Sequence, residues 1–108
     1  MTTAPIEIAP RELEEMLRKG EAVHLVDVRA GWEHELVALP GDTLIPLHTL
    51  GARAHELVRG RRIVVYCHHG VRSYMAAVAL REAGFEALSL AGGIDLWAAA
   101  IDSSMKRY

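Results

Sequence analysis

The sequence predicts an α/β protein with a parallel sheet that carries helices on both faces. Short apolar runs alternate with segments in which apolar residues recur at helical spacing, and the connections between them are short. The run Ile63-Val64-Val65-Tyr66 is continuously apolar, which is typical of a central parallel strand that is covered on both faces. No repeat, low-complexity stretch or linker interrupts the 108 residues, so we expect a single domain over 1–108.

The N-terminal half is predicted to hold three strands and the segments that connect them. The expected elements in chain order are a strand at 6–8, a helix over 10–19, a strand over 24–28, a helical turn over 32–36, a strand at 44–45 and a helix over 48–58. Pro10 suits the first position of a helix, where its missing N–H has no partner to lose. Gly20 suits the position after a helix, and Pro40-Gly41-Asp42 is a strong turn signal.

The C-terminal half places a cysteine at the end of its clearest strand. We expect a strand over 63–66, an alanine-rich helix over 73–83, a fifth strand around 88–90, and a last helix after Gly92-Gly93. Gly84 suits the residue that follows the alanine-rich helix. Sites in open parallel sheets form outside the carboxyl ends of the strands, and Cys67 directly follows such an end.

Charge and hydropathy argue against several classes of partner. The formal net charge is −2 and the pI is near 6.3, so no overall field favours nucleic acid or anionic lipid. The cluster Arg59, Arg61 and Arg62 is interpreted as solvated residues before a strand. The N-terminus lacks the pattern of a signal peptide, and no apolar run approaches the roughly 20 residues that span a membrane. We therefore expect a cytoplasmic protein without a nucleic-acid or membrane partner.

Cys67 is the only cysteine, which excludes an internal disulfide, a Cys-x-x-Cys pair and a multi-cysteine zinc site. The six histidines show no spacing typical of a metal site, and Gly92-Gly93 alone is too weak to indicate a nucleotide site. We expect neither a metal nor a cofactor. A lone cysteine is usually a small buried hydrophobe, so its neighbours must decide whether it is reactive.

The segment from Cys67 to Ser73 combines features that together would hold an anion. Gly70 permits a sharp bend after the strand, and the backbone N–H groups of a loop curled around Cys67 would converge on its sulfur. The following helix would add its positive end, Arg72 a full charge, and Ser73 a cap or a hydroxyl donor. Positive charge favours the thiolate, which is the nucleophile. The alternative is an inert core cysteine.

Five motifs, in order and at these spacings, resemble the rhodanese family. They are Asp27-Val28-Arg29, Pro40-Gly41, the loop Cys67-x-x-Gly70-x-Arg72-Ser73, Gly84-Phe85, and the run from Leu90 to Trp97. The resemblance implies a rhodanese-like three-layer fold with a central parallel five-stranded sheet. One departure is Val37-Ala38-Leu39, where the family often has Gly-His-Ile. The resemblance therefore does not predict the wall of the site around residues 30 to 39, nor the sulfur donor.

The resemblance also implies a thiosulfate sulfurtransferase. In that family the cysteine takes sulfane sulfur from a donor such as thiosulfate, becomes a persulfide, and passes the sulfur to cyanide or a thiol. Cys67 and Arg72 would then be catalytic, and Asp27 and Arg29 would support the site or form a structural ion pair. The residues whose amides would form the substrate cradle are His68, His69, Gly70, Val71 and Ser73. The two histidines either help to bind an anion or face the solvent.

Two other functions compete with this interpretation. Related phosphatases and arsenate reductases use a Cys-x5-Arg loop, whereas four residues separate Cys67 from Arg72, and the shorter loop favours a single sulfur atom. A module that relays sulfur without turnover, or that only binds a partner, would share the same fold. The tail 101–108 resembles tails of rhodanese domains attached to adenylyltransferases of sulfur-carrier proteins. It hints at a protein that donates or accepts sulfur.

Overall fold

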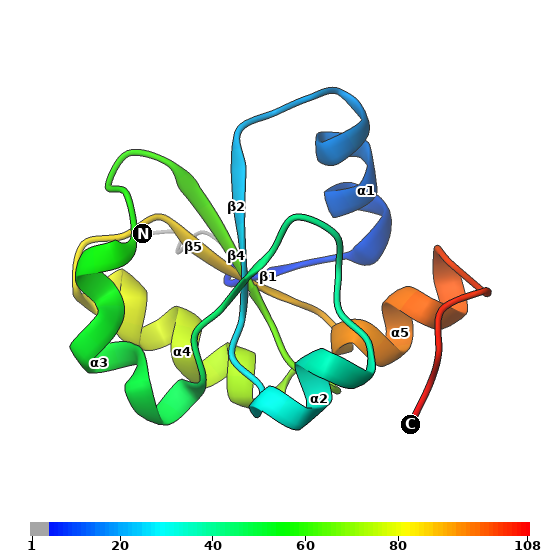
Figure 1. The fold of residues 1–108 in the computed structure, drawn as a ribbon. Coiled ribbons are helices and arrows are strands. Elements are labelled where there is room, and N and C mark those ends of the chain that lie inside the picture. The colour runs from blue at the N-terminus through cyan, green and yellow to red at the C-terminus, as the bar shows by residue number, and fades with distance from the viewer. Residues whose placement is uncertain (1–4) are drawn as a thin grey trace.

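Five parallel strands form the central sheet of the structure, a computed structural model that describes residues 5–108 (Figure 1). The strands are β1 (Glu7–Ile8), β2 (Val23–Asp27), β3 (Thr43–Leu44), β4 (Arg62–Tyr66) and β5 (Ala87–Leu90). Their order across the sheet is β1-β5-β4-β2-β3, and every neighbouring pair is parallel. The apolar run at 63–66 therefore lies in the central strand, as its composition predicts.

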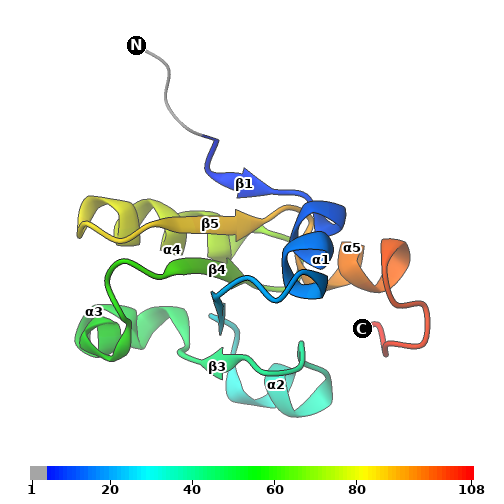
Figure 2. The same cartoon turned by 90° about the horizontal axis from the view of Figure 1, so that it is seen from above.

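Helices cover both faces of this sheet. They are α1 (Pro10–Arg18), α2 (Gly31–Leu36), α3 (Leu50–Arg53), α4 (Val71–Glu82) and α5 (Gly93–Ala100). Helices α3 and α4 lie on one side of the strands and α1 and α5 on the other, while α2 follows the carboxyl end of β2 (Figures 1 and 2). The predicted α/β fold with a five-stranded parallel sheet is confirmed. Within residues 5–108, no helix combines the length and the apolar character needed to cross a membrane.

The side chains of β4 alternate between two separate hydrophobic clusters. Ile63 and Val65 pack on the face that α4 covers, whereas Val64 and Tyr66 pack on the face that α1 and α5 cover. All four are completely buried. Burial of this strand on both sides explains why its sequence is apolar at every position rather than at alternate ones. It also fixes the position of the residue that follows, Cys67.

Two predicted helices differ from the structure at their boundaries. The expected helix over 48–58 is broken into η1 (Leu47–Thr49), α3 and η2 (Ala54–Glu56). The hydroxyl of Thr49 donates to the carbonyl of Pro46 (2.8 Å), a local bond that competes with regular helix. Helix α4 starts at Val71 rather than at Ser73, because Gly70 takes the position directly before it with a φ of 100°. The cysteine loop is therefore shorter than expected.

Candidate active site

The sulfur of Cys67 lies at the carboxyl end of β4 and receives backbone N–H groups from the loop that follows. Gly70 N–H donates to Sγ at 3.1 Å and Ser73 N–H at 3.3 Å. The residue is 1% exposed. Both donors lie at the start of α4, whose positive end therefore points at the sulfur. An anionic sulfur or a small anion on it would be stabilised at this position.

Gly70 is required here for two separate reasons. Its φ of 100° lies in the left-handed region, which residues with a side chain rarely adopt. A Cβ at this position would also lie 3.2 Å from the backbone nitrogen of Gly92. Gly70 thus lets the chain turn from β4 into α4 while the loop that precedes α5 lies against it.

The start of α5 binds the cysteine loop from the other side. Ile94 N–H donates to the carbonyl of Cys67 (2.9 Å), and Asp95 N–H donates to the carbonyl of His68 (3.1 Å). Because these N–H groups have no partner within their own helix, the two segments satisfy each other. The motif Gly92-Gly93 therefore has a structural function: it brings the start of α5 against the loop.

Two buried serines lie beside the sulfur. Ser73 Oγ is 3.4 Å from Cys67 Sγ and 2.8 Å from Ser89 Oγ, and both serines are completely buried. A Cys67 thiol donates to the Ser73 hydroxyl, whereas a thiolate would accept from it. Ser89 connects this contact to β5. The sequence pattern did not indicate Ser89, which occupies an alternating position within an ordinary strand.

Arg72 binds a carboxylate that the sequence did not reveal. Its Nη1 donates to Glu33 Oε1 (2.6 Å) and its Nη2 to Glu33 Oε2 (3.0 Å), a bidentate pair between α4 and α2. Hydrogen bonding to Arg72 lowers the pKa of Glu33 to about 2. The same bond raises the pKa of Arg72, and the nearby Cys67 adds to that rise. Arg72 thus remains charged and interacts electrostatically with Cys67, but its hydrogen-bond partner is Glu33.

Asp27 and Arg29 form a completely buried ion pair at the end of β2. Arg29 Nε donates to Asp27 Oδ1 (2.9 Å) and Nη2 to Oδ2 (2.8 Å). Burial alone would lower the pKa of Arg29, but the bond to Asp27 outweighs it and the pKa is raised. The Nδ1 atom of His34 also lies 3.0 Å from Asp27 Oδ2. The pair supports the connection between β2 and α2, and helix α2 carries Glu33.

Comparisons with known proteins agree with this geometry. Residues 9–100 match the family model of the rhodanese-like domain. This chain belongs to the rhodanese family. The crystal structure of a rhodanese-like domain protein from Staphylococcus aureus superposes with a TM-score of 0.82 at 26% identity, over 94% of this chain and 97% of that one.

Relatives of this rhodanese include both short and long proteins. A protein named Sulfurtransferase from Allochromatium vinosum is 37% identical over 93 residues, which are 85% of this chain and 87% of that protein. Probable adenylyltransferase/sulfurtransferase MoeZ of Mycobacterium tuberculosis is 40% identical over 104 residues, 94% of this chain and 26% of that protein. The chain thus spans about a quarter of the length of such relatives. The relatives named as sulfurtransferases support a transferase function for the domain.

The two histidines of the rhodanese loop stack on each other and on the C-terminal segment. The ring centroids of His68 and His69 are 3.8 Å apart, and those of His68 and Tyr108 are also 3.8 Å apart. Burial, followed by the charge of His69, lowers the pKa of His68. His69 is exposed, and its Nε2 lies 3.8 Å from Asp95 Oδ2. Neither side chain donates to the sulfur among the hydrogen bonds of the described residues.

The two histidines of the loop and Asp95 bring three potential ligand atoms together. The ligand atoms of His68, His69 and Asp95 lie within 4.8 Å of one another. Arg107, however, donates to both oxygens of Asp95, at 3.0 and 3.1 Å, so this carboxylate already has a cationic partner.

Val71, predicted in the cradle, is the first residue of α4, and its side chain is 70% exposed. Its side chain can face a partner but does not line the sulfur.

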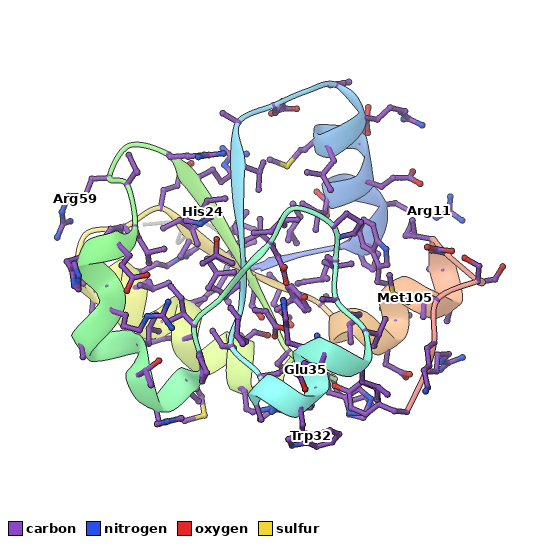
Figure 3. All side chains as sticks on the ribbon, in the orientation of Figure 1. Arg11, His24, Trp32, Glu35, Arg59 and Met105 are labelled. Atoms are coloured by element: carbon purple, nitrogen blue, oxygen red, sulfur yellow. The ribbon has the colours of Figure 1, made fainter. Side chains whose placement is uncertain are left out.

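Lowering the pH is expected to weaken the fold through Glu33. Its pKa of about 2 lies below the ordinary value near 4.5, so its stabilisation is present above about pH 4.5 and is lost as the pH falls toward 2. The difference between these two pKa values corresponds to an effect on the order of 3 kcal/mol. Solvent screens little of it, because Glu33 is nearly completely buried. Glu33→Gln should therefore flatten the acid limb of the unfolding free energy, measured by urea denaturation across pH. Glu35→Gln, on the exposed side of α2, is the matched control (Figure 3). Equal acid limbs in Glu33→Gln and the wild type would contradict this role.

Proposed function

We propose that this rhodanese moves sulfane sulfur from thiosulfate or a persulfide donor to a thiol or cyanide through a persulfide on Cys67. One observation carries the proposal. Two backbone N–H groups and the positive end of α4 converge on the sulfur of the only cysteine. An amide cradle of this kind stabilises negative charge on sulfur both before and after transfer. It supports a reactive thiolate that carries sulfur more directly than it supports an inert core cysteine.

The proposed reaction has two displacements at sulfur. The Cys67 thiolate attacks the outer sulfur of thiosulfate, the S–S bond of the donor breaks, and sulfite leaves with the bonding electron pair. The outer sulfur of the resulting persulfide is then attacked by cyanide or a thiolate, and the Cys67 thiolate leaves. The Cys67 thiolate, the persulfide and the regenerated thiolate each carry one negative charge on sulfur, and no outside oxidant is needed. Gly70 N–H and Ser73 N–H hold the anionic sulfur in each state.

Arg72 is proposed to favour the approach of the anionic donor. Arg72 lies in the first turn of α4, directly before Ser73, whose N–H binds the sulfur, and the charge of Cys67 helps to raise the pKa of Arg72. The carboxylate of Glu33 holds the guanidinium in one place, since two parallel hydrogen bonds fix its plane. The remaining N–H groups of the guanidinium are available to an oxyanion. Glu33 thus orients Arg72, although it also offsets part of its charge.

The rate of thiocyanate formation from thiosulfate and cyanide tests the role of Arg72 against those of the two histidines. Arg72→Ala is expected to lower the rate about 100-fold, the effect of losing one preorganised donor to a developing anion. His68→Ala and His69→Ala should lower it less than about three-fold, because neither ring hydrogen-bonds to the sulfur and, unlike Arg72, neither is a permanent cation. Urea unfolding of each variant controls for damage to the fold. Equal losses in all three variants would show general disorder of the loop rather than a role for Arg72.

A relay that takes sulfur only from a protein is the second candidate. Exposed apolar side chains near the loop favour it: Trp32 is 64% exposed, Val71 70% and Met75 60%. Trp32 projects outward from α2 (Figure 3). Such side chains are typical of protein contact surfaces. Sulfur loading from a cysteine desulfurase without turnover of thiosulfate would favour the relay, whereas rapid thiocyanate formation would favour the enzyme.

A further inference from the structure

The hydroxyl group of Tyr108 lies between the two ion pairs of the site. It donates to Glu33 Oε2 (2.6 Å) and accepts from Arg29 Nη1 (2.8 Å). Glu33 binds Arg72, and Arg29 binds Asp27, so one hydroxyl connects the buried pair at the end of β2 with the pair at the start of α4. The C-terminal segment returns toward α2 after α5 to make these contacts (Figure 1).

The ring of Tyr108 makes a second set of contacts at the same place. It stacks on His68 with an interplanar angle of 5°, and Trp32 meets it edge-on with centroids 6.0 Å apart. The side chain therefore contacts the loop between β2 and α2, helix α2 itself, and the loop that carries Cys67. Burial, followed by the bond to Glu33, raises the pKa of Tyr108 to about 12. The hydroxyl keeps its proton at neutral pH and remains a donor.

We propose that Tyr108 is a positioning residue of this site: its hydroxyl group holds Glu33 so that the Arg72 guanidinium stays in place near the loop that carries Cys67. The inference rests on the proposed sulfur transfer, in which Arg72 favours an anionic donor. Tyr108 itself does not contact the sulfur. It acts on the carboxylate that orients Arg72.

The direction of the effect follows from the sharing of Glu33. Oε2 of this carboxylate accepts from both Tyr108 and Arg72, whereas Oε1 accepts from Arg72 and from the backbone N–H of Ala30. Without the hydroxyl, Oε2 loses the donor that connects Glu33 to the buried Asp27–Arg29 pair, so Glu33 and the Arg72 guanidinium bound to it can shift together. A displaced guanidinium presents less positive charge to the loop. Without the hydroxyl, the rate of reaction at Cys67 should fall more for anionic reagents than for neutral ones.

Tyr108→Phe tests the hydroxyl because it keeps the ring that stacks on His68. Tyr74→Phe is the matched control, since it removes a hydroxyl from a side chain of α4 that is 42% exposed. The first readout is the single-turnover rate at which Cys67 gains sulfur from thiosulfate. The second is the ratio of the alkylation rate constants of Cys67 with anionic iodoacetate and neutral iodoacetamide. That ratio reports the charge that a reagent meets at the sulfur, and a purely structural role for Tyr108 would not move it.

We expect Tyr108→Phe to slow sulfur gain about ten-fold and to lower the iodoacetate-to-iodoacetamide ratio about three-fold, while Tyr74→Phe changes neither. An unchanged ratio in Tyr108→Phe would overturn the proposal, even if its melting temperature fell. Impairment of Tyr108→Ala alone, with Tyr108→Phe like the wild type, would assign the effect to the ring and also overturn it. If the wild type gains no sulfur, the proposed transfer fails, yet a lowered ratio would still support positioning by Tyr108.

Discussion

Replacing Cys67 with serine is expected to abolish sulfur transfer, with thiocyanate formation at least about 1,000-fold below the wild type. Serine cannot form a stable bond to sulfane sulfur, and this chain has no second cysteine to take over. The fold should survive, because a serine hydroxyl accepts the same N–H groups of Gly70 and Ser73 that the sulfur accepts. We expect the free energy of unfolding to change by about 1 kcal/mol.

The measurement is turnover of thiosulfate and cyanide together with urea unfolding. Cys67→Ala is the companion variant, which removes the acceptor and leaves the two N–H groups without a partner. It should unfold more readily than Cys67→Ser by about 1–3 kcal/mol. Unchanged turnover in Cys67→Ser would refute the mechanism, and a collapsed fold would show that the sulfur itself, rather than an acceptor of its size, is needed.

Gly93→Ala is expected to have the largest effect on stability. A Cβ at this position would lie 2.4 Å from the carbonyl oxygen of His68 and 2.6 Å from that of Cys67. The φ of 62° adds strain for any residue with a side chain. Because the overlapping atoms belong to the backbone of the cysteine loop, they cannot rotate away. We expect a loss of about 4 kcal/mol, from about 1–2 for strain and 1–3 for overlap.

Gly20→Ala separates these two causes. Gly20 has a similar φ of 74°, but a Cβ there would have nothing within 4 Å. It should lose only the strain, about 1–2 kcal/mol, and should keep its sulfur-transfer rate. Gly93→Ala should lose both stability and transfer, since any relief of the overlap moves the carbonyls of the loop. Equal losses in the two variants, measured by urea unfolding, would contradict the close packing of α5 against the loop.

Local sequence patterns predict the fold class, but they do not predict the strand order or the exact bounds of the helices. The continuous apolar run in β4 and the alternation of strands and helices were sufficient to predict the parallel sheet. The strand order β1-β5-β4-β2-β3 and the break in the helix at 48–58 were not predicted. Side-chain hydrogen bonds lie at this break, such as the one from Thr49 to Pro46, and periodicity does not predict them.

In the site too, contacts between residues close in sequence were predicted more readily than contacts between distant residues. The N–H contacts of Gly70 and Ser73 with the sulfur were predicted, because both residues lie within six positions of Cys67. Glu33 lies 39 positions from Arg72 and was missed, as was Tyr108 at 75 positions from Glu33. No motif in a single sequence joins such distant residues. The resemblance of the tail at 101–108 to known rhodanese tails was the one signal that touched Tyr108, and it indicated a pathway rather than a contact.

Intact-mass spectrometry after incubation with thiosulfate tests directly for a persulfide on Cys67, with Cys67→Ser treated in parallel. We expect a gain of one sulfur atom in the wild type, removed by cyanide or a thiol and absent from Cys67→Ser. The incubation is repeated with a cysteine desulfurase as donor, so that a relay with a protein donor is also detected. A wild type that gains no sulfur from either donor, or a gain that persists in Cys67→Ser, would contradict a persulfide on Cys67.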